Sequence, residues 1–155
     1  MKSHSRYAKK LDRKRVLICM IMFFALLPVF SYLHEAGHAL VCIADGNEAE
    51  ISVNFNGGTT LCHGDISNPF PYKISGGLLA GIIGTTIGIA LFRWKIPFIA
   101  LTTIGAGHLI NAVIEAFADS YFTHGAEWSL FLGLVEFVTF FSLMIIFDRK
   151  TVRAV

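Results

Sequence analysis

Four long apolar stretches separate short polar segments along the 155-residue chain. They run over about residues 16–44, 74–92, 96–118 and 128–147. Each is close to the ~20 residues that an α-helix needs to cross the hydrocarbon core of a bilayer. The pattern therefore predicts an all-α membrane protein with about four transmembrane helices. The first stretch is longer and contains Pro28, so it should tilt, kink at the proline or project from the membrane.

A shorter pattern lies between the first two apolar stretches. Residues 50–55 alternate polar and apolar side chains, and a glycine pair, Gly57-Gly58, follows them. Alternation of this kind beside a glycine turn is typical of a β-hairpin. We therefore expect a hairpin over about residues 48–63. Because an isolated two-stranded hairpin is only marginally stable, it should pack against the helices or the membrane surface.

The overall composition favours a membrane protein with one domain. Hydrophobic residues make up 54% of the chain, charged residues make up only 15%, and the mean hydropathy is +0.61. Soluble domains carry about 25% charged residues. The predicted transmembrane domain spans residues 16–147, between a basic tail over residues 1–15 and a second tail over residues 148–155.

The basic residues predict the orientation of the chain in the membrane. Residues 1–15, the connection at Arg93 and Lys95, and residues 148–155 hold seven, two and three of the 13 Lys and Arg residues. Since basic residues gather on the cytoplasmic side, both tails are predicted to be cytoplasmic. The hairpin and the turn near residues 119–127 then face the extracytoplasmic side. The first tail adjoins a membrane anchor, so its expected partner is the lipid bilayer and not nucleic acid.

The chain has three cysteines, Cys19, Cys42 and Cys62. Their number is odd and their spacing shows no pairs, so a disulfide framework is not expected. We predict that they are small buried apolar side chains.

The candidate chemistry lies near the end of the first apolar stretch, in the run His34-Glu35-Ala36-Gly37-His38. On a helix, residues four apart share a face, about 5–6 Å apart at their Cβ atoms, so both imidazoles can bind one Zn²⁺. The glutamate can then act as a general base toward a water that the zinc activates. Ionisable residues inside a membrane helix cost about 2.5–3.5 kcal/mol each and mark functional sites. Cleavage of this stretch as a signal peptide would destroy the site. We therefore expect it to be a retained membrane anchor.

A zinc site of this kind needs a third protein ligand and an open position. His34 lies about 27 Å along its helix from Val16, near the outer edge of the hydrocarbon core. The third apolar stretch runs from inside to outside, so its C-terminal end should reach the same level. That end carries a stripe of polar residues spaced three, four and four: His108, Asn111, Glu115 and Asp119.

Together these residues resemble the site-2 protease family of intramembrane zinc metalloproteases. The resemblance covers most of residues 30–125, and it rests on the run over residues 34–38, the Gly57-Gly58 hairpin and the small-residue segment 75–81. It implies one zinc ion held by the two histidines of the run, with the glutamate between them as the catalytic residue. It also implies hydrolysis of a peptide bond in or near a transmembrane segment of a membrane-protein substrate.

In that family, a later helix carries an Asn and, eight residues on, an Asp that is the third zinc ligand and is usually followed by Gly. Asn111 and Asp119 have this spacing. The resemblance therefore implies Asp119 as the third ligand and Asn111 as a residue that contacts the substrate or orients a ligand. Two features depart from the family pattern: no proline lies between these two residues, and Ser120 follows Asp119.

Three other residues remain candidates for the third ligand. His124-Gly125 could replace the Asp-Gly pair of the family. Glu115, about 28 Å along its helix, matches the depth of the histidine pair more closely than the preferred aspartate does. His108 is the last candidate. Any residue of this group that is not a ligand is expected to orient one.

The departures from the family pattern leave a second function open, that of a non-catalytic membrane scaffold or chaperone derived from the protease fold. Metal content would distinguish the two functions. In the enzyme, the hairpin edge could bind an extended substrate as an added strand. Either protein could work with a regulatory membrane partner or as an oligomer.

Overall fold

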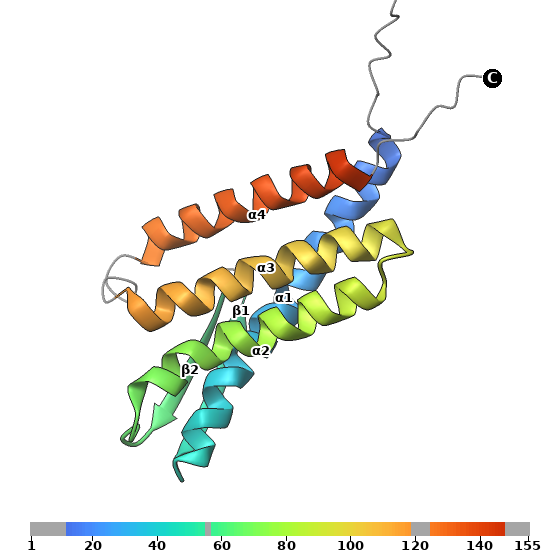
Figure 1. The fold of residues 1–155 in the computed structure, drawn as a ribbon. Helices are drawn as coiled ribbons and strands as arrows, with labels where there is room; N and C mark the ends of the chain where they lie inside the picture. Colours follow the sequence, from blue (N-terminus) through green and yellow to red (C-terminus); the bar gives the residue numbers. More distant parts are fainter. Residues whose placement is uncertain (1–11, 55–56, 119–124, 148–155) are drawn as a thin grey trace, which may run out of the picture.

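The computed structural model describes residues 12–54, 57–118 and 125–147, which form four helices and one hairpin (Figure 1). In chain order the elements are α1 Arg13–Ala44, β1 Glu48–Asn54, β2 Gly57–His63, α2 Pro69–Ala90, α3 Lys95–Phe117 and α4 Gly125–Phe147. All four helices are long and apolar enough to cross a membrane. The prediction of a helical fold with a hairpin after the first helix is confirmed, and both strands lie within residues 48–63.

The helices begin one to five residues earlier than the apolar pattern predicts, at residues 13, 69, 95 and 125 instead of about 16, 74, 96 and 128. α1 starts at Arg13, inside the predicted tail, because the Asp12 carboxylate accepts a backbone N–H two residues on, at 3.1 Å. α2 starts at Pro69 instead of about residue 74, and Asn68 caps it in the same way. Proline is compatible with the first turn of a helix, since the N–H that it lacks would have no partner there.

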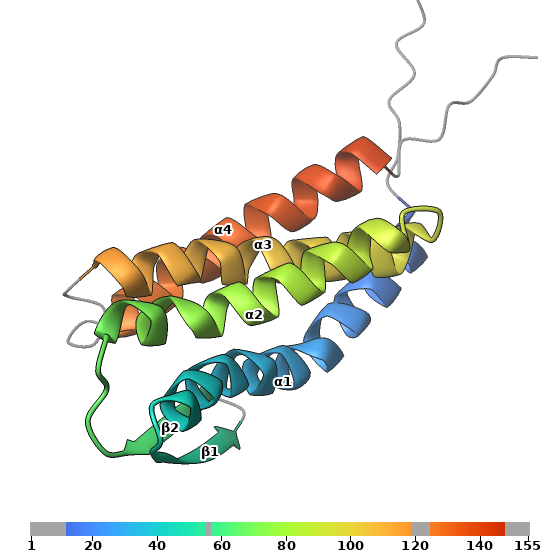
Figure 2. The ribbon, with the colours of Figure 1, turned by 60° about the horizontal axis from the view of Figure 1, so that its bottom comes forward.

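α1 changes direction near the middle of its length (Figure 2). Pro28 lies inside this helix, where it removes one backbone hydrogen bond and its ring clashes with the preceding turn. Beyond the bend, the helix lies against both strands of the hairpin (Figure 2). The half of α1 that carries the predicted histidines is therefore the half that packs on the hairpin.

α2 and α3 lie side by side and pack through glycines of α2 (Figure 1). A Cβ atom at Gly77 would lie 2.5 Å from the Ala112 backbone nitrogen, and one at Gly81 would lie 2.6 Å from the Leu109 side chain. Small residues allow membrane helices to approach this closely. The contact fixes the position of the α3 side chains relative to α2 along the helix axis.

The two ends of the helix bundle carry different groups. At one end, the Lys95 ammonium donates to the Phe147 carbonyl at 2.7 Å, and the Cys19 thiol lies 3.6 Å from the Ile96 carbonyl oxygen. The hairpin lies at the other end (Figure 1). The basic connection at Arg93 and Lys95 therefore shares an end with the start of α1 and the end of α4, as the predicted topology requires.

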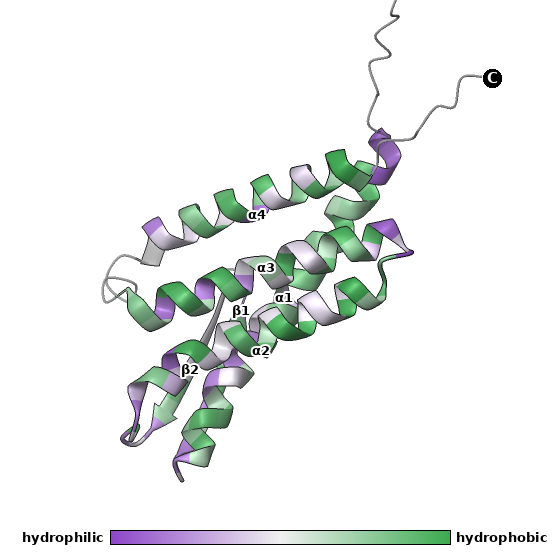
Figure 3. Ribbon diagram, in the orientation of Figure 1, coloured by the Kyte–Doolittle hydropathy of each residue, from purple (hydrophilic) through white to green (hydrophobic). Residues whose placement is uncertain are grey.

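The helices consist mostly of apolar residues (Figure 3), and many of their large apolar side chains are exposed. On α4, Leu130 is 77% exposed, and Phe137 and Ile146 are exposed as well. Soluble proteins rarely leave large contiguous apolar patches in water. Hydrocarbon is the solvent that suits such a surface.

Two cysteines form a disulfide, which was not expected from the sequence. Cys42, near the end of α1, is bonded to Cys62 on β2, 20 positions later. The prediction of three unpaired buried cysteines was wrong for this pair, because the hairpin must fold back on α1 before the two meet. Cys19 is free and buried, as predicted. The disulfide ties the hairpin to the helix that carries the histidines.

Candidate metal centre

The second half of α1 brings the two predicted histidine ligands together. His34, Glu35 and His38 are all buried there. The Nε2 atoms of the two histidines lie 3.1 Å apart, and their ring planes meet at 72° with centroids 4.9 Å apart. One turn of helix therefore makes the two nitrogens converge on one point.

Glu115 joins this pair from α3. Its Oε1 lies 3.2 Å from His34 Nε2, and its Oε2 lies 3.6 Å from His38 Nε2. Each of the three residues offers one ligand atom, and these atoms all lie within 4.8 Å of one another. Glu115 is only 4% exposed. The three residues form a buried group that could hold a metal ion.

The preferred third ligand, Asp119, lies outside the described residues, as does the alternative His124. Helix α3 ends at Phe117 and Ala118 caps it. Within the described part of the chain, Glu115 is the carboxylate that joins the histidine pair. The structure thus brings together the two predicted histidines and one of the alternatives for the third ligand.

The backbone of α2 orients His38. The Nδ1–H of its ring donates to the Tyr72 carbonyl at 2.6 Å, and the Tyr72 ring packs against the imidazole with centroids 5.0 Å apart. A neutral imidazole with its proton on Nδ1 has a lone pair on Nε2. The hydrogen bond therefore selects the tautomer that presents Nε2 to a metal.

Two more residues of the polar stripe on α3 contact the ligand residues. His108 Nδ1 lies 3.3 Å from His34 Nδ1, so one nitrogen donates to the other. The Asn111 amide donates to Glu115 Oε1 at 3.1 Å. His108 and Asn111 are thus placed to orient a ligand, which is the role expected for residues of the stripe that do not bind the metal.

Glycines let α2 come close to the histidines. A Cβ atom at Gly76 would lie 2.8 Å from His34 Nε2 and would also overlap with His38 Nε2. A Cβ atom at Gly37 would overlap with the Ser75 carbonyl oxygen. A side chain at either glycine would push the helices apart or fill the point where the nitrogens converge. The small-residue segment 75–81 stands out in the sequence, but no local pattern assigns Gly76 this position.

The hairpin holds Glu35. The Thr60 hydroxyl lies 2.7 Å from Glu35 Oε2 and 2.9 Å from the Glu35 backbone oxygen, and it can donate to either. Gly58 packs on the same side chain, since a Cβ atom there would overlap with Glu35 Cγ. Neither hairpin residue was predicted as part of the site. The signals in the sequence were the Gly57-Gly58 pair and the position of the hairpin, directly after the histidine helix.

A cavity of about 370 Å³ opens beside the cluster. Its wall includes the three possible ligands, Glu35, Tyr72 and residues 58–60 of β2. A molecule in this cavity would therefore meet the three possible metal ligands, the carboxylate of Glu35 and the second strand of the hairpin together.

The donor set fits a zinc ion. Two imidazole nitrogens and one carboxylate, with a cavity on the remaining side, match the three protein ligands and the open position of catalytic zinc sites. Electron-rich atoms this close in a buried place repel one another unless a cation or a proton lies between them. Imidazole and carboxylate also suit other divalent metals, so the ligands support a metal site without identifying the ion.

Comparison with protein-family models, with curated proteins and with solved structures finds no match for this chain. The function is therefore argued from the chemistry and geometry of the site.

Proposed function

We propose that this chain is an intramembrane zinc metalloprotease, similar in its site to the site-2 protease family. It would hydrolyse a peptide bond in or near a transmembrane segment of a membrane-protein substrate. One observation carries the proposal: His34, His38 and Glu115 converge on one point beside a second acid, Glu35, that is not part of the ligand set. A structural metal site needs neither a spare carboxylate nor an adjoining cavity, whereas a hydrolytic site needs both.

The two histidines and Glu115 would hold the zinc, as one ion. Bound there, zinc would act as a Lewis acid that activates water and polarises a peptide carbonyl. For His34 to present Nε2, its Nδ1–H must donate to His108 Nδ1, which the 3.3 Å separation allows. The Asn111 amide would keep Glu115 Oε1 in place through its hydrogen bond.

Glu35 would be the general base. Its carboxylate accepts a proton from a water molecule as the water oxygen adds to the carbon of the substrate carbonyl. The carbon–nitrogen bond of the peptide then breaks, and Glu35 gives the proton to the departing amine nitrogen. The Thr60 hydroxyl, at 2.7 Å, holds the carboxylate in the cavity wall.

The hairpin would bind the substrate backbone. A transmembrane helix hides its carbonyls in internal hydrogen bonds, so it must unwind before one of them can be attacked. Residues 58–60 of β2 line the cavity, and β2 pairs with β1 along one of its edges. Adding an unwound segment to the other edge would supply hydrogen-bond partners for its backbone.

The proposed orientation puts both chain ends in the cytoplasm and the site near the extracytoplasmic surface. The distribution of basic residues supports this orientation. The disulfide between Cys42 and Cys62 supports it independently, because disulfides form and persist in oxidising compartments. The hairpin that carries Cys62 would then lie outside the cytoplasm.

Replacing Glu35 with Gln tests the proposal. Glu35→Gln keeps the size of the side chain but removes the base, so cleavage should fall by about 10²–10⁴-fold while bound zinc is retained. Full-length protein in lipid vesicles would be assayed against a library of single-span peptides with a fluorescent group and a quencher. Glu50→Gln is the matched control, because Glu50 lies on the hairpin with its side chain 74% exposed.

Equal cleavage by Glu35→Gln and the parent would contradict the enzyme mechanism. Absence of zinc from the parent, together with full cellular function of Glu35→Gln, would favour the non-catalytic scaffold or chaperone. A regulatory partner or an oligomer would be detected as activity that is present in membranes and lost from the purified chain.

A further inference from the structure

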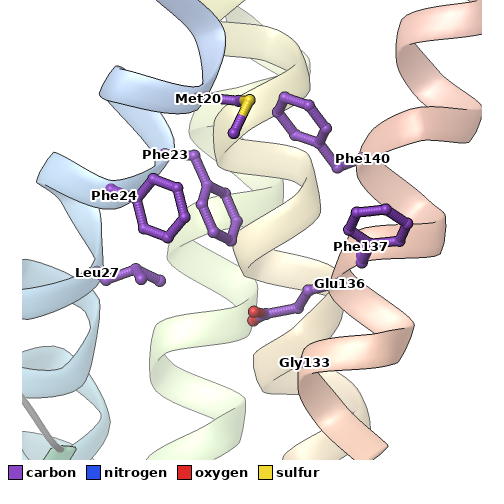
Figure 4. A pocket seen from close by; sticks show the side chains of 8 residues that line it. All are labelled: Met20, Phe23, Phe24, Leu27, Gly133, Glu136, Phe137 and Phe140. Atoms are coloured by element: carbon purple, nitrogen blue, oxygen red, sulfur yellow. The ribbon is translucent and has the colours of Figure 1, made fainter. Parts of the chain in front are cut away.

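A second cavity, of about 260 Å³, lies between α1 and α4 on the inner half of α1 (Figure 4). α1 contributes Met20, Phe23, Phe24 and Leu27, spaced as one face of a helix. α4 contributes its own face from Gly133 to Phe140 across the gap (Figure 4). We refer to this space as the α1–α4 groove.

The groove is closed at one end and open at the other. At the inner end, the rings of Phe23 and Phe140 meet with centroids 6.0 Å apart. At Gly133, seven residues and about two turns of α4 further toward the outer end, a Cβ atom would meet nothing within 4 Å. The open end is therefore the end that faces the level of the hairpin and the metal cluster.

Glu136 stands in the wall of this otherwise apolar groove. It is the twelfth of the 23 residues of α4, so it lies at the middle of a predicted membrane span. Its side chain reaches from α4 into the space between the helices (Figure 4). Among the described residues, Glu136 has no hydrogen-bond or ion-pair partner. Placing a carboxyl group at this depth in a membrane costs free energy, so such a residue marks a functional position. A binding partner for it is therefore expected outside the described residues.

The position of the groove relative to the metal cluster can be followed along two helices. Leu27, the last α1 residue of the groove, precedes His34 by seven residues, which is about 10 Å along a helix. Glu136 packs on Gly107 of α3, where a Cβ atom would lie 2.7 Å from its Cγ. Gly107 precedes Glu115 by eight residues, about 12 Å along the helix. Both routes place the carboxylate of Glu136 about two helical turns on the inner side of the cluster.

We propose that the α1–α4 groove receives the transmembrane helix of the substrate, and that Glu136 selects helices with a Lys or Arg near mid-membrane. The inference rests on the proposed function, because it takes the occupant to be the chain that is cut. An ammonium or guanidinium group is the partner that complements a carboxylate in hydrocarbon. The basic residue would lie on the cytoplasmic side of the cleaved bond, about four residues away if the intervening chain is extended and about eight if it is helical.

Binding of model helices tests the groove without requiring cleavage. The probe is an oligoleucine transmembrane peptide with one central Lys, compared with the all-Leu peptide and with a central-Glu peptide. Each carries a fluorescence donor, and the acceptor is attached to full-length Glu35→Gln protein in lipid vesicles. We expect about tenfold tighter binding of the central-Lys peptide, at the upper end of polar contacts between membrane helices.

Variants of the groove test separately how its charge and its shape contribute to peptide binding. Glu136→Gln should abolish the preference for Lys, and Glu136→Lys should transfer it to the central-Glu peptide. Gly133→Trp should fill the open end and weaken binding of every peptide, whereas Leu130→Trp on the exposed face of α4 should not. Retention of zinc by each variant would show that the fold is intact.

Two results would overturn the inference. One is equal binding of the central-Lys and all-Leu peptides to the parent, or a Lys preference that survives Glu136→Gln. The other is self-association of the parent that Gly133→Trp disrupts, which would assign the groove to a second copy of the chain. Failure of the proposed chemistry is distinguishable, since it would leave the Lys preference intact and remove only cleavage.

Discussion

Thr60 on the hairpin and Glu35 on α1 are 25 positions apart in the sequence, and the Thr60 hydroxyl lies 2.7 Å from Glu35 Oε2. This contact joins the strand proposed to bind the substrate to the residue proposed to activate water. In the proposed enzyme, the hairpin would therefore position the general base as well as bind the substrate.

Thr60→Val removes this hydroxyl and keeps the shape of the side chain. A hydrogen bond to a charged group contributes about 1.5–3 kcal/mol, so cleavage should fall by about tenfold or more. Zinc content should not change, because Thr60 is not one of the three proposed ligands. Thr60→Ser keeps the hydroxyl and should retain most of the activity. Parent-like cleavage by Thr60→Val in the vesicle assay would show that the hairpin does not position Glu35.

Gly76 and Gly58 should separate metal binding from catalysis. A methyl group at Gly76 would overlap with His38 Nε2 and crowd His34 Nε2, so Gly76→Ala should weaken zinc binding by about 10–100-fold or more. A methyl group at Gly58 would instead overlap with the Glu35 side chain, so the Gly58→Ala variant should keep zinc and lose cleavage. Competition with a chelator measures the zinc affinity of both variants. The assignment of the two glycines is wrong if Gly76→Ala keeps the parent affinity or if Gly58→Ala loses zinc.

The disulfide between Cys42 and Cys62 leaves one thiol that can react before reduction. In the denatured, unreduced protein, a maleimide reagent should label Cys19 alone, and after reduction it should label all three cysteines. The double variant Cys42→Ser/Cys62→Ser should lose about 3 kcal/mol of stability, the entropic cost of freeing a loop of about this length. Its hairpin should become more sensitive to a protease added on the extracytoplasmic side. Three reactive thiols before reduction would contradict the link between α1 and β2.

The helices and the hairpin could be predicted because their signals are local. Hydropathy marks a span of about 20 residues, and alternation beside a glycine pair marks a hairpin. The start of α2 was missed because Pro69 and Pro71, followed by Lys73, resemble a loop, although proline suits the first turn of a helix. The capping contact of Asn68 is a local signal that could have placed this start correctly.

The rest of the site depends on contacts between distant segments, which no local pattern contains. The spacing of the polar stripe on α3 does not say which of its residues faces α1, and packing of α3 on the glycines of α2 turns Glu115 toward the histidines. The bond from Cys42 to Cys62 could have been found only by combining the predicted topology with the turn of the hairpin. Thr60 and Gly76 join the site for the same reason, through the hairpin and α2.

The zinc content of the purified protein tests the metal centre most directly. Full-length parent and single variants would be purified in detergent without added metal, and zinc per chain would be measured by elemental analysis. The proposed site predicts one zinc per chain in the parent, its loss from His38→Ala and Glu115→Ala, and parent-like content in Asp119→Ala and His124→Ala. A parent without zinc, or zinc that is lost from Asp119→Ala or His124→Ala while Glu115→Ala retains it, would contradict the site.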